Sequence, residues 1–168
     1  MATQKLQPTR ALQVIPSENA SIPSVNLLVS SISTSQGANS LIDTNANFII
    51  TTTNGVQYKV NVGDVVYNYT TGKAATIVQV VSNTTLLLNA DNIVLSGEAY
   101  SIYQQGGQTG IGNQGCVLYI GTGGSIKVTT SGNDILTFVN VQDGTFFPIN
   151  VLKVFATGTV ATNIIALW

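Results

Sequence analysis

The sequence predicts an all-β protein, and two observations carry this prediction. Val, Ile and Thr together supply 56 of the 168 residues, and β-branched side chains favour strands because a helix restricts their χ1 rotation. No window of a dozen residues has a sustained apolar stripe with the 3.6-residue period of an amphipathic helix. We therefore expect short antiparallel strands joined by turns along almost the whole chain.

The composition limits the classes of function. Only 8% of the residues are charged, the formal net charge is −1, and there is no His. Ser, Thr, Asn and Gln supply 61 residues, so uncharged polar groups cover much of the surface. Such a charge gives no electrostatic attraction for nucleic acid or an anionic membrane, and the lack of His excludes His-based catalysis and an ordinary zinc site. Because repulsion between copies grows with their charge, this composition favours assembly.

Residues 1–28 are predicted to form an extended arm whose short strand, at 11–15, packs with the C-terminal module. Pro16 ends that strand, and a loop bounded by prolines follows. The arm lacks the apolar segment of a secretory signal, and no run in the chain approaches a membrane-spanning length, so we expect synthesis in the cytoplasm. Residues 30–40 (SSISTSQGANS) are small and polar and are predicted to be a linker.

Residues 29–104 are predicted to contain a small antiparallel barrel of the SH3-like kind. Tyr58, Val60 and Val62 alternate with polar neighbours, which is typical of a half-buried strand. The predicted strands cover residues 58–62, 65–69, 74–81, 84–88 and 99–103. Five short strands separated by tight turns favour a closed barrel.

Residues 105–115 are predicted to be a glycine-rich connector, and residues 116–168 a second module, a β-sandwich of the jelly-roll-like kind. Asp143-Gly144 is a strong hairpin signal because Gly adopts a positive φ without steric cost. The predicted strands of this module cover residues 117–120, 125–130, 134–141, 149–156 and 163–168.

Five apolar residues near the end of the sequence are candidate contact residues between protein chains. Phe146 and Phe147 are neighbours in a strand, so they point to opposite faces: one can fill the core while the other faces outward. The chain ends in the apolar sequence IIALW, which must be buried either in its own core or against a neighbour. The candidates are Phe146, Phe147, Ile165, Leu167 and Trp168.

The sequence contains only weak matches to catalytic or ligand-binding motifs. Residues 110–115 match the G-x-G-x-x-G pattern, but the segment that follows is strand-like, whereas a dinucleotide site needs a helix there. Cys116 is the one cysteine of the chain and lies in an apolar run, so we expect a small buried side chain and no intrachain disulfide. Asp64, Asp134 and Asp143 each lie at a turn, where Asp ordinarily accepts backbone hydrogen bonds.

Several segments resemble the head-spike base and related capsid decoration proteins of tailed phages and gene transfer agents. They are residues 10–17 (RALQVIPS), 121–130 (GTGGSIKVTT), 138–149 (FVNVQDGTFFPI), 156–159 (ATGT) and 165–168 (IALW). Residues 29–104 are absent from the short members of this family and look like an added module. Some of its segments are similar to virion proteins of marine phages.

The resemblance implies a non-enzymatic virion structural protein: a decoration or cement protein, or a head-spike base, on the capsid surface. It implies a homo-oligomer, a trimer or a pentamer, whose other partners are the major capsid protein and a fibre protein, with no nucleic acid, membrane, cofactor, metal or catalytic residue. The protein would be made in the cytoplasm of a host bacterium. The five apolar candidates then become contacts with sister subunits or the capsid.

Two other functions stay open. Tyr58, Tyr67 and Tyr69 lie close together in the sequence and can line a sugar-binding face, which would make the chain a tail or fibre component for host attachment. A hydrolase with paired carboxylates, for instance Asp64 and Asp134, is the third hypothesis.

Overall fold

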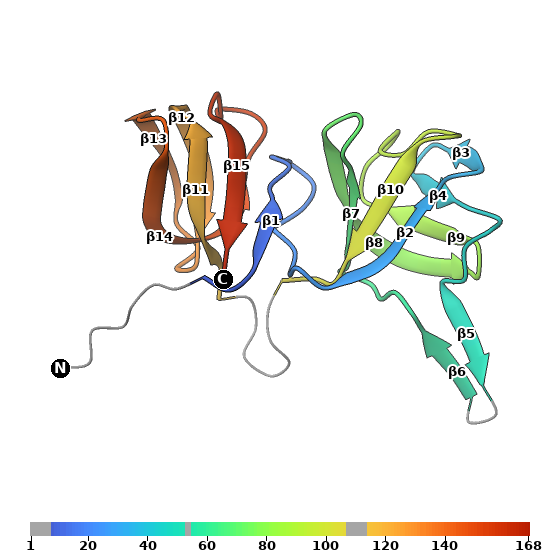
Figure 1. The fold of residues 1–168 in the computed structure, drawn as a ribbon. Coiled ribbons are helices and arrows are strands. Elements are labelled where there is room, and N and C mark those ends of the chain that lie inside the picture. Colours follow the sequence, from blue (N-terminus) through green and yellow to red (C-terminus); the bar gives the residue numbers. More distant parts are fainter. Residues whose placement is uncertain (1–7, 53–54, 107–113) are drawn as a thin grey trace.

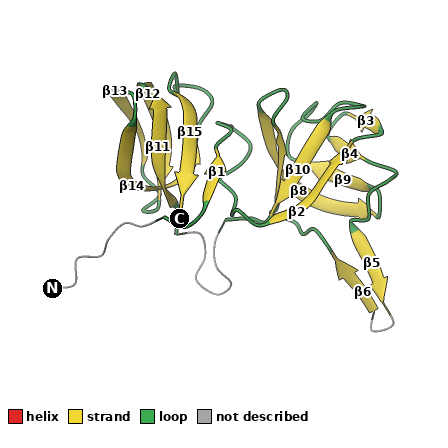
Figure 2. Ribbon diagram, viewed as in Figure 1, coloured by secondary structure: helices red, strands yellow, loops and turns green. Residues whose placement is uncertain are grey.

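The computed structural model describes residues 8–52, 55–106 and 114–168. These residues contain fifteen strands and no helix (Figure 2), so the all-β prediction is confirmed. The strands form a six-stranded sheet, a seven-stranded sheet and a separate two-stranded hairpin, and the strand pairs are antiparallel. Most of the predicted connector falls at residues 107–113, outside the described residues.

The six-stranded sheet, called here the C-terminal sheet, has the order β1-β15-β11-β14-β12-β13 (Figure 1). Its strands are β1 (Ala11–Gln13), β11 (Cys116–Thr122), β12 (Gly124–Thr130), β13 (Ile135–Val141), β14 (Thr145–Val154) and β15 (Thr162–Leu167). They are hydrogen-bonded into one continuous sheet, whereas a sandwich of the expected kind has two separate sheets. β1 pairs with β15, so the first described strand adjoins the last.

The core of the C-terminal sheet forms on one face of four strands. Cys116, Leu118 and Ile120 point to this face from β11, and Ile126 and Val128 alternate with half-buried residues on β12. These side chains join Ile164 and others from β14 and β15 in one buried cluster. Because the same face of all four strands meets in this cluster, the sheet curves around its own core.

The seven-stranded sheet, called here the middle sheet, has the order β2-β10-β7-β8-β9-β4-β3. Its strands are β2 (Leu27–Ile32), β3 (Ser35–Gly37), β4 (Ser40–Ile42), β7 (Val65–Asn68), β8 (Lys73–Ser82), β9 (Thr85–Leu88) and β10 (Ala99–Tyr103). The prediction of an SH3-like barrel is wrong, because this sheet does not close. Closing the sheet requires its two outermost strands, β2 and β3, to pair, but β3 pairs with β4 alone among the described strands.

The predicted linker at residues 30–40 is also wrong, because this segment contributes to three strands of the middle sheet. Its polar side chains find partners inside the fold. Ser33 is buried, and its hydroxyl donates to the carbonyl of Leu95 at 2.6 Å. A serine-rich sequence can therefore form strands here. Its hydroxyl groups bond to backbone carbonyls, and its own backbone groups pair in the strand ladder.

The strand predicted at 58–62 is displaced toward the N-terminus. β5 (Ile49–Thr52) and β6 (Gly55–Tyr58) form a two-stranded ribbon, called here the hairpin, that extends away from the middle sheet (Figure 1). Val60 is fully buried and Val62 is exposed, but both lie beyond the end of β6. The alternation at residues 58–62 therefore does not mark a strand, because residues 59–62 lead the chain from β6 back to the middle sheet.

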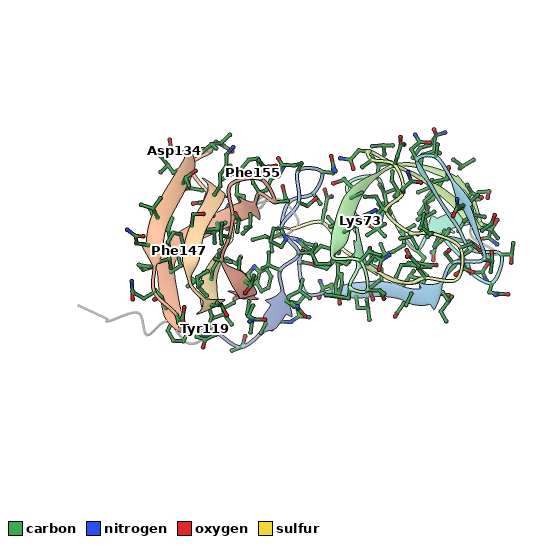
Figure 3. The ribbon with its side chains drawn as sticks, turned by 90° about the horizontal axis from the view of Figure 1, so that it is seen from above. Lys73, Tyr119, Asp134, Phe147 and Phe155 are labelled. Carbon is green, nitrogen blue, oxygen red and sulfur yellow. The ribbon has the colours of Figure 1, made fainter. Side chains whose placement is uncertain are left out.

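The N-terminal arm joins the two sheets. Leu12, Ile15 and Ala20 pack with Val65 and Tyr67 of the middle sheet in a third buried cluster. The hydroxyl of Ser17 donates to the carbonyl of Ala74 at 2.9 Å, and Val14 donates its backbone N–H to Ile164 of the C-terminal sheet. Figure 3 shows the arm between Phe147 of one sheet and Lys73 of the other.

Candidate assembly surface

The outermost strand of the C-terminal sheet exposes large apolar side chains. Ile135 of β13 is 59% exposed, Leu136 49% and Val139 69%. We call these three residues the β13 strip. Exposed apolar residues that occur singly are common, but several on one strand indicate a contact surface.

The free edge of β13 adds a second property to this surface. Among the described residues, β13 is hydrogen-bonded to β12 alone and ends the sheet. An edge strand presents unpaired N–H and C=O groups that can pair with another chain, and proteins usually protect such edges with charges, Pro or a covering segment. β13 has no charged residue between Ile135 and Val141, so it carries none of the usual protection by charge.

The two neighbouring phenylalanines of β14 point in opposite directions, as the sequence predicts. Phe147 is 6% exposed and packs in the core, with its ring at 4.7 Å from that of Phe138 in a T-shaped arrangement. Phe146 is 59% exposed, and its ring lies 5.4 Å from that of Tyr119 on the outer face. Of the two, Phe146 is available for contact with a partner.

The apolar end of the chain is packed mainly against its own molecule. Trp168 contacts both the core of the C-terminal sheet and the cluster that joins the two sheets. Its carbonyl accepts the backbone N–H groups of Thr9 and Arg10. Ile165 and Leu167 are half-buried on the outer face of β15, where Ile165 pairs with Tyr119 across the strands. Trp168 therefore joins parts of one chain, which the sequence could not distinguish from a contact between chains.

Most of the acidic side chains serve as acceptors for the fold. Asp64 accepts the backbone N–H groups of Asn61 and Gln105, and Asp143 accepts that of Gly123 at 2.6 Å. Asp134 accepts the hydroxyl of Thr130 at 3.5 Å. The turn positions predicted for these three residues are confirmed for Asp64 and Asp143 by hydrogen bonds of the expected kind.

Asp43 is the most deeply buried carboxylate of the middle sheet. It accepts the hydroxyl of Tyr100 at 2.7 Å and the backbone N–H of Asn45 at 2.9 Å. Burial acts to raise the pKa of Asp43, but hydrogen bonds from Ser31, Tyr100, Asn45 and Ala46 outweigh it and hold this pKa below its usual value. The pKa of Tyr100 is raised, first by burial and then by its hydrogen bond to Asp43. Asp43 and Tyr100 thus tie the strands of the middle sheet together.

The tyrosines of the middle sheet do not form one exposed face. Tyr67 is buried, whereas Tyr58 lies exposed on the hairpin. Tyr69 is 41% exposed, and its hydroxyl lies 3.2 Å from that of Tyr103. Tyr69 borders an open hollow of about 280 Å³, which is also lined by Gln13 and Asn163. An aromatic ring beside carboxamide groups is an arrangement with features of a sugar-binding site.

Metal ligands, membrane-spanning helices and the thiol are the remaining features that bear on chemistry. The described residues contain no group of three or more His, Cys, Asp or Glu side chains placed to hold a metal ion. No helix in that part of the chain is long and apolar enough to cross a membrane. Cys116 is buried, as expected, and burial raises the pKa of its thiol to about 12, so it is far less reactive than an ordinary cysteine.

Comparison of the chain with protein-family models, with curated proteins and with solved structures gives no match. The exposed surface is therefore the main observation that bears on function. The sequence also contains a signal for the β13 strip, although no contact residue was predicted there. Residues 135–139 (ILTFV) are apolar on both faces of a strand, which is typical of a strand covered on both sides.

Proposed function

We propose that this chain is a non-enzymatic structural subunit of a phage virion: a capsid-surface decoration or cement protein, or a head-spike base, that works as a homo-oligomer. The observation that carries the assembly part is the β13 strip on an open, uncharged sheet edge. The sequence resemblance of residues 121–130 and 138–149 supports its place on a phage head. The major capsid protein and a fibre protein are its further proposed partners.

The chemistry of the surface supports a structural part rather than a catalyst. Five of the seven acidic residues accept backbone N–H groups in loops and turns: Glu18, Asp43, Asp64, Glu98 and Asp143. Carboxylates held this way keep the loops in shape, because they satisfy backbone N–H groups that no strand partner reaches. A lattice repeats each weak contact many times, so even a small apolar edge gives firm attachment through avidity.

A matched pair of substitutions tests the assembly. Val139→Glu places a charge on the β13 strip, whereas Val160→Glu places the same charge at a valine that is 71% exposed and outside the strip. We expect the parent protein and Val160→Glu to form the same oligomer, and Val139→Glu to fall to the monomer mass. Size-exclusion chromatography with light scattering measures this, and circular dichroism checks that both variants fold.

Two outcomes would count against the proposal. A parent protein that stays monomeric at high concentration would contradict assembly through this edge, and so would equal loss of the oligomer in both variants. The place on the particle has its own test, which is imaging of labelled protein on virions. Label on the tail instead of the head would contradict a capsid role.

The second candidate function is host attachment through carbohydrate, as part of a tail or fibre. Tyr69 and the hollow beside Gln13 and Asn163 are the observation that favours it. The intact chain on a glycan array tests this candidate, with Tyr69→Ala as the variant expected to lose binding. A signal that survives Tyr69→Ala would contradict this site.

A further inference from the structure

The hairpin needs a partner that its own sheet does not supply. β5 and β6 pair with each other and with no other described strand. All four residues of β6 are exposed, and Val56 is 57% and Tyr58 55% exposed. A lone two-stranded ribbon is only marginally stable in water, and a third strand is the usual remedy. The hairpin is therefore a ribbon with apolar side chains and an open edge.

The β13 strip is the complementary surface, and it lies at the other end of the molecule. Figure 1 shows β13 at the outer side of the C-terminal sheet and the hairpin beyond the middle sheet. One chain cannot bring its own hairpin to its own β13 across this length. The two open edges can meet only when they come from different copies.

Charge selects the direction of this pairing. Lys59 directly follows β6 and is the one charged residue between Asp43 and Asp64. Asp134 directly precedes β13, and there is no Lys or Arg between Lys127 and Lys153. An antiparallel pair places the end of β6 beside the start of β13, so Lys59 meets Asp134. A parallel pair separates these two charges.

We propose, on the basis of the assembly proposed above, that β6 of one copy adds antiparallel to β13 of the next copy. With Lys59 opposite Asp134, Tyr58 lies opposite Ile135 and Val56 lies opposite Thr137. Alternate residues share a face, so Tyr58 and Val56 cover the face of β13 that holds Ile135. Main-chain hydrogen bonds supply the affinity and the side chains supply the register, as in other cases of strand addition.

This contact is heterologous, because two different surfaces meet. Such contacts close into rings when the rotation between copies allows it and otherwise continue as fibres. A ring of this kind can have three or five members, whereas an isologous β13–β13 contact would stop at a dimer.

Disulfide trapping between variants of the full chain that each carry one added cysteine tests the pairing. Tyr58→Cys is mixed with a mass-tagged Ile135→Cys and oxidised, and heterodimers are counted on a non-reducing gel. The native Cys116 is 3% exposed, so it can stay in place, and the parent protein serves as the blank. Gln57→Cys is the matched control, since its side chain points to the other face of the hairpin. We expect about five-fold more heterodimer with Tyr58→Cys than with Gln57→Cys, because a disulfide needs its Cβ atoms within a few ångströms.

The outcomes separate this inference from the assembly on which it rests. Equal trapping by Tyr58→Cys and Gln57→Cys, or self-trapping of Ile135→Cys as the main product, overturns the hairpin pairing. An oligomer by light scattering with no Tyr58–Ile135 product overturns it too, but leaves the assembly proposal in place. A protein that is monomeric and gives no cross-link overturns both.

Discussion

Phe146 and Phe147 are adjacent in β14, but their side chains lie on opposite faces of the sheet. Phe147 fills the core beside Phe138, and Phe146 covers Tyr119 on the outer face. Strand geometry makes the two side chains alternate, so one of them was bound to point outward. Which of them faces the core depends on the register of β14 with β11, where Phe147 pairs with Leu118.

Their substitution by alanine therefore has unequal effects on stability. Phe147→Ala leaves a cavity in the core and should lower the free energy of unfolding by about 3–5 kcal/mol. Phe146→Ala removes the aromatic contact with Tyr119 and should cost no more than about 1.5 kcal/mol. Urea denaturation followed by circular dichroism measures both. Similar losses in the two variants would show that Phe146 is as important for the fold as Phe147.

At the residue scale, alternation and turn chemistry were predictable and long-range partners were not. The buried Cys116, the outward or inward phenylalanines and the turn at Asp143-Gly144 follow from local pattern. The packing of Trp168 between two sheets does not, since the cluster that joins the sheets is formed by residues between positions 12 and 103, far from it in the sequence. A terminal apolar residue looks the same in sequence whether its own chain or another covers it.

At the element scale, the junction of β12, β13 and β14 depends on two glycines. Gly123 lies so close to the carbonyl of Val141 that a Cβ there would collide with backbone. Gly144 has a φ of 69° but has open space around it, with the hydroxyl of Tyr119 as the nearest group at 3.9 Å. The first glycine is required by space and the second by backbone conformation.

These two requirements predict different costs for the same substitution. Gly144→Ala should lose about 1–2 kcal/mol of stability, the usual cost of a left-handed residue with a Cβ. Gly123→Ala should lose about 3 kcal/mol or more, because the backbone at the end of β13, beside Gly123, has to move. Free energies of unfolding from urea titrations decide the order. A more damaging Gly144→Ala would contradict the close approach at Gly123.

The strands with a clear period were predicted well, and those with mixed signals were not. β10 matches its predicted bounds, β9 differs by one residue at its start, and β8 is longer by one residue at each end. The larger differences lie at residues 30–40 and 58–62, and β14 begins at Thr145, four residues before its predicted start. In the first segment, a serine-rich sequence forms strands because the fold gives its hydroxyl groups acceptors. In the second, the hairpin leaves the sheet, so exposure no longer follows the alternation.

At the scale of the whole molecule, the two sheets are held together by the cluster around Leu12 and Trp168. Trp168 is the one tryptophan of the chain, so its fluorescence reports on this junction. Leu12 is 9% exposed and packs with Val65 and Tyr67 there.

Leu12→Ala should therefore separate the junction from the sheets in an unfolding experiment. The lost packing costs about 2–5 kcal/mol, so tryptophan emission should shift to the red at a lower urea concentration than in the parent, ahead of the loss of strand signal in circular dichroism. Val160→Ala, at an exposed site outside the β13 strip, is the control and should leave the two transitions coincident. An unchanged emission transition in Leu12→Ala would contradict the role of the cluster.

The number of sheets, and whether each one closes, could not be predicted from the sequence. Composition and turn spacing predict many antiparallel strands, but a barrel and an open sheet differ only in whether the two outermost strands pair. That choice depends on β2 and β3, of which β3 has three residues. The β13 strip was missed for a similar reason: a strand that is apolar on both faces can lie inside one molecule or between two.

The route of the chain through the junction has one more consequence. Ser24 donates its N–H to the carbonyl of Gln104, and Gln104 donates its own to the carbonyl of Asn26, each at 2.9 Å. The chain thus enters the middle sheet and returns from it at one place, while β1 and β15 remain paired in the C-terminal sheet. Evolution or protein engineering can therefore replace the middle sheet with another domain whose two ends lie close together, and still keep the C-terminal sheet.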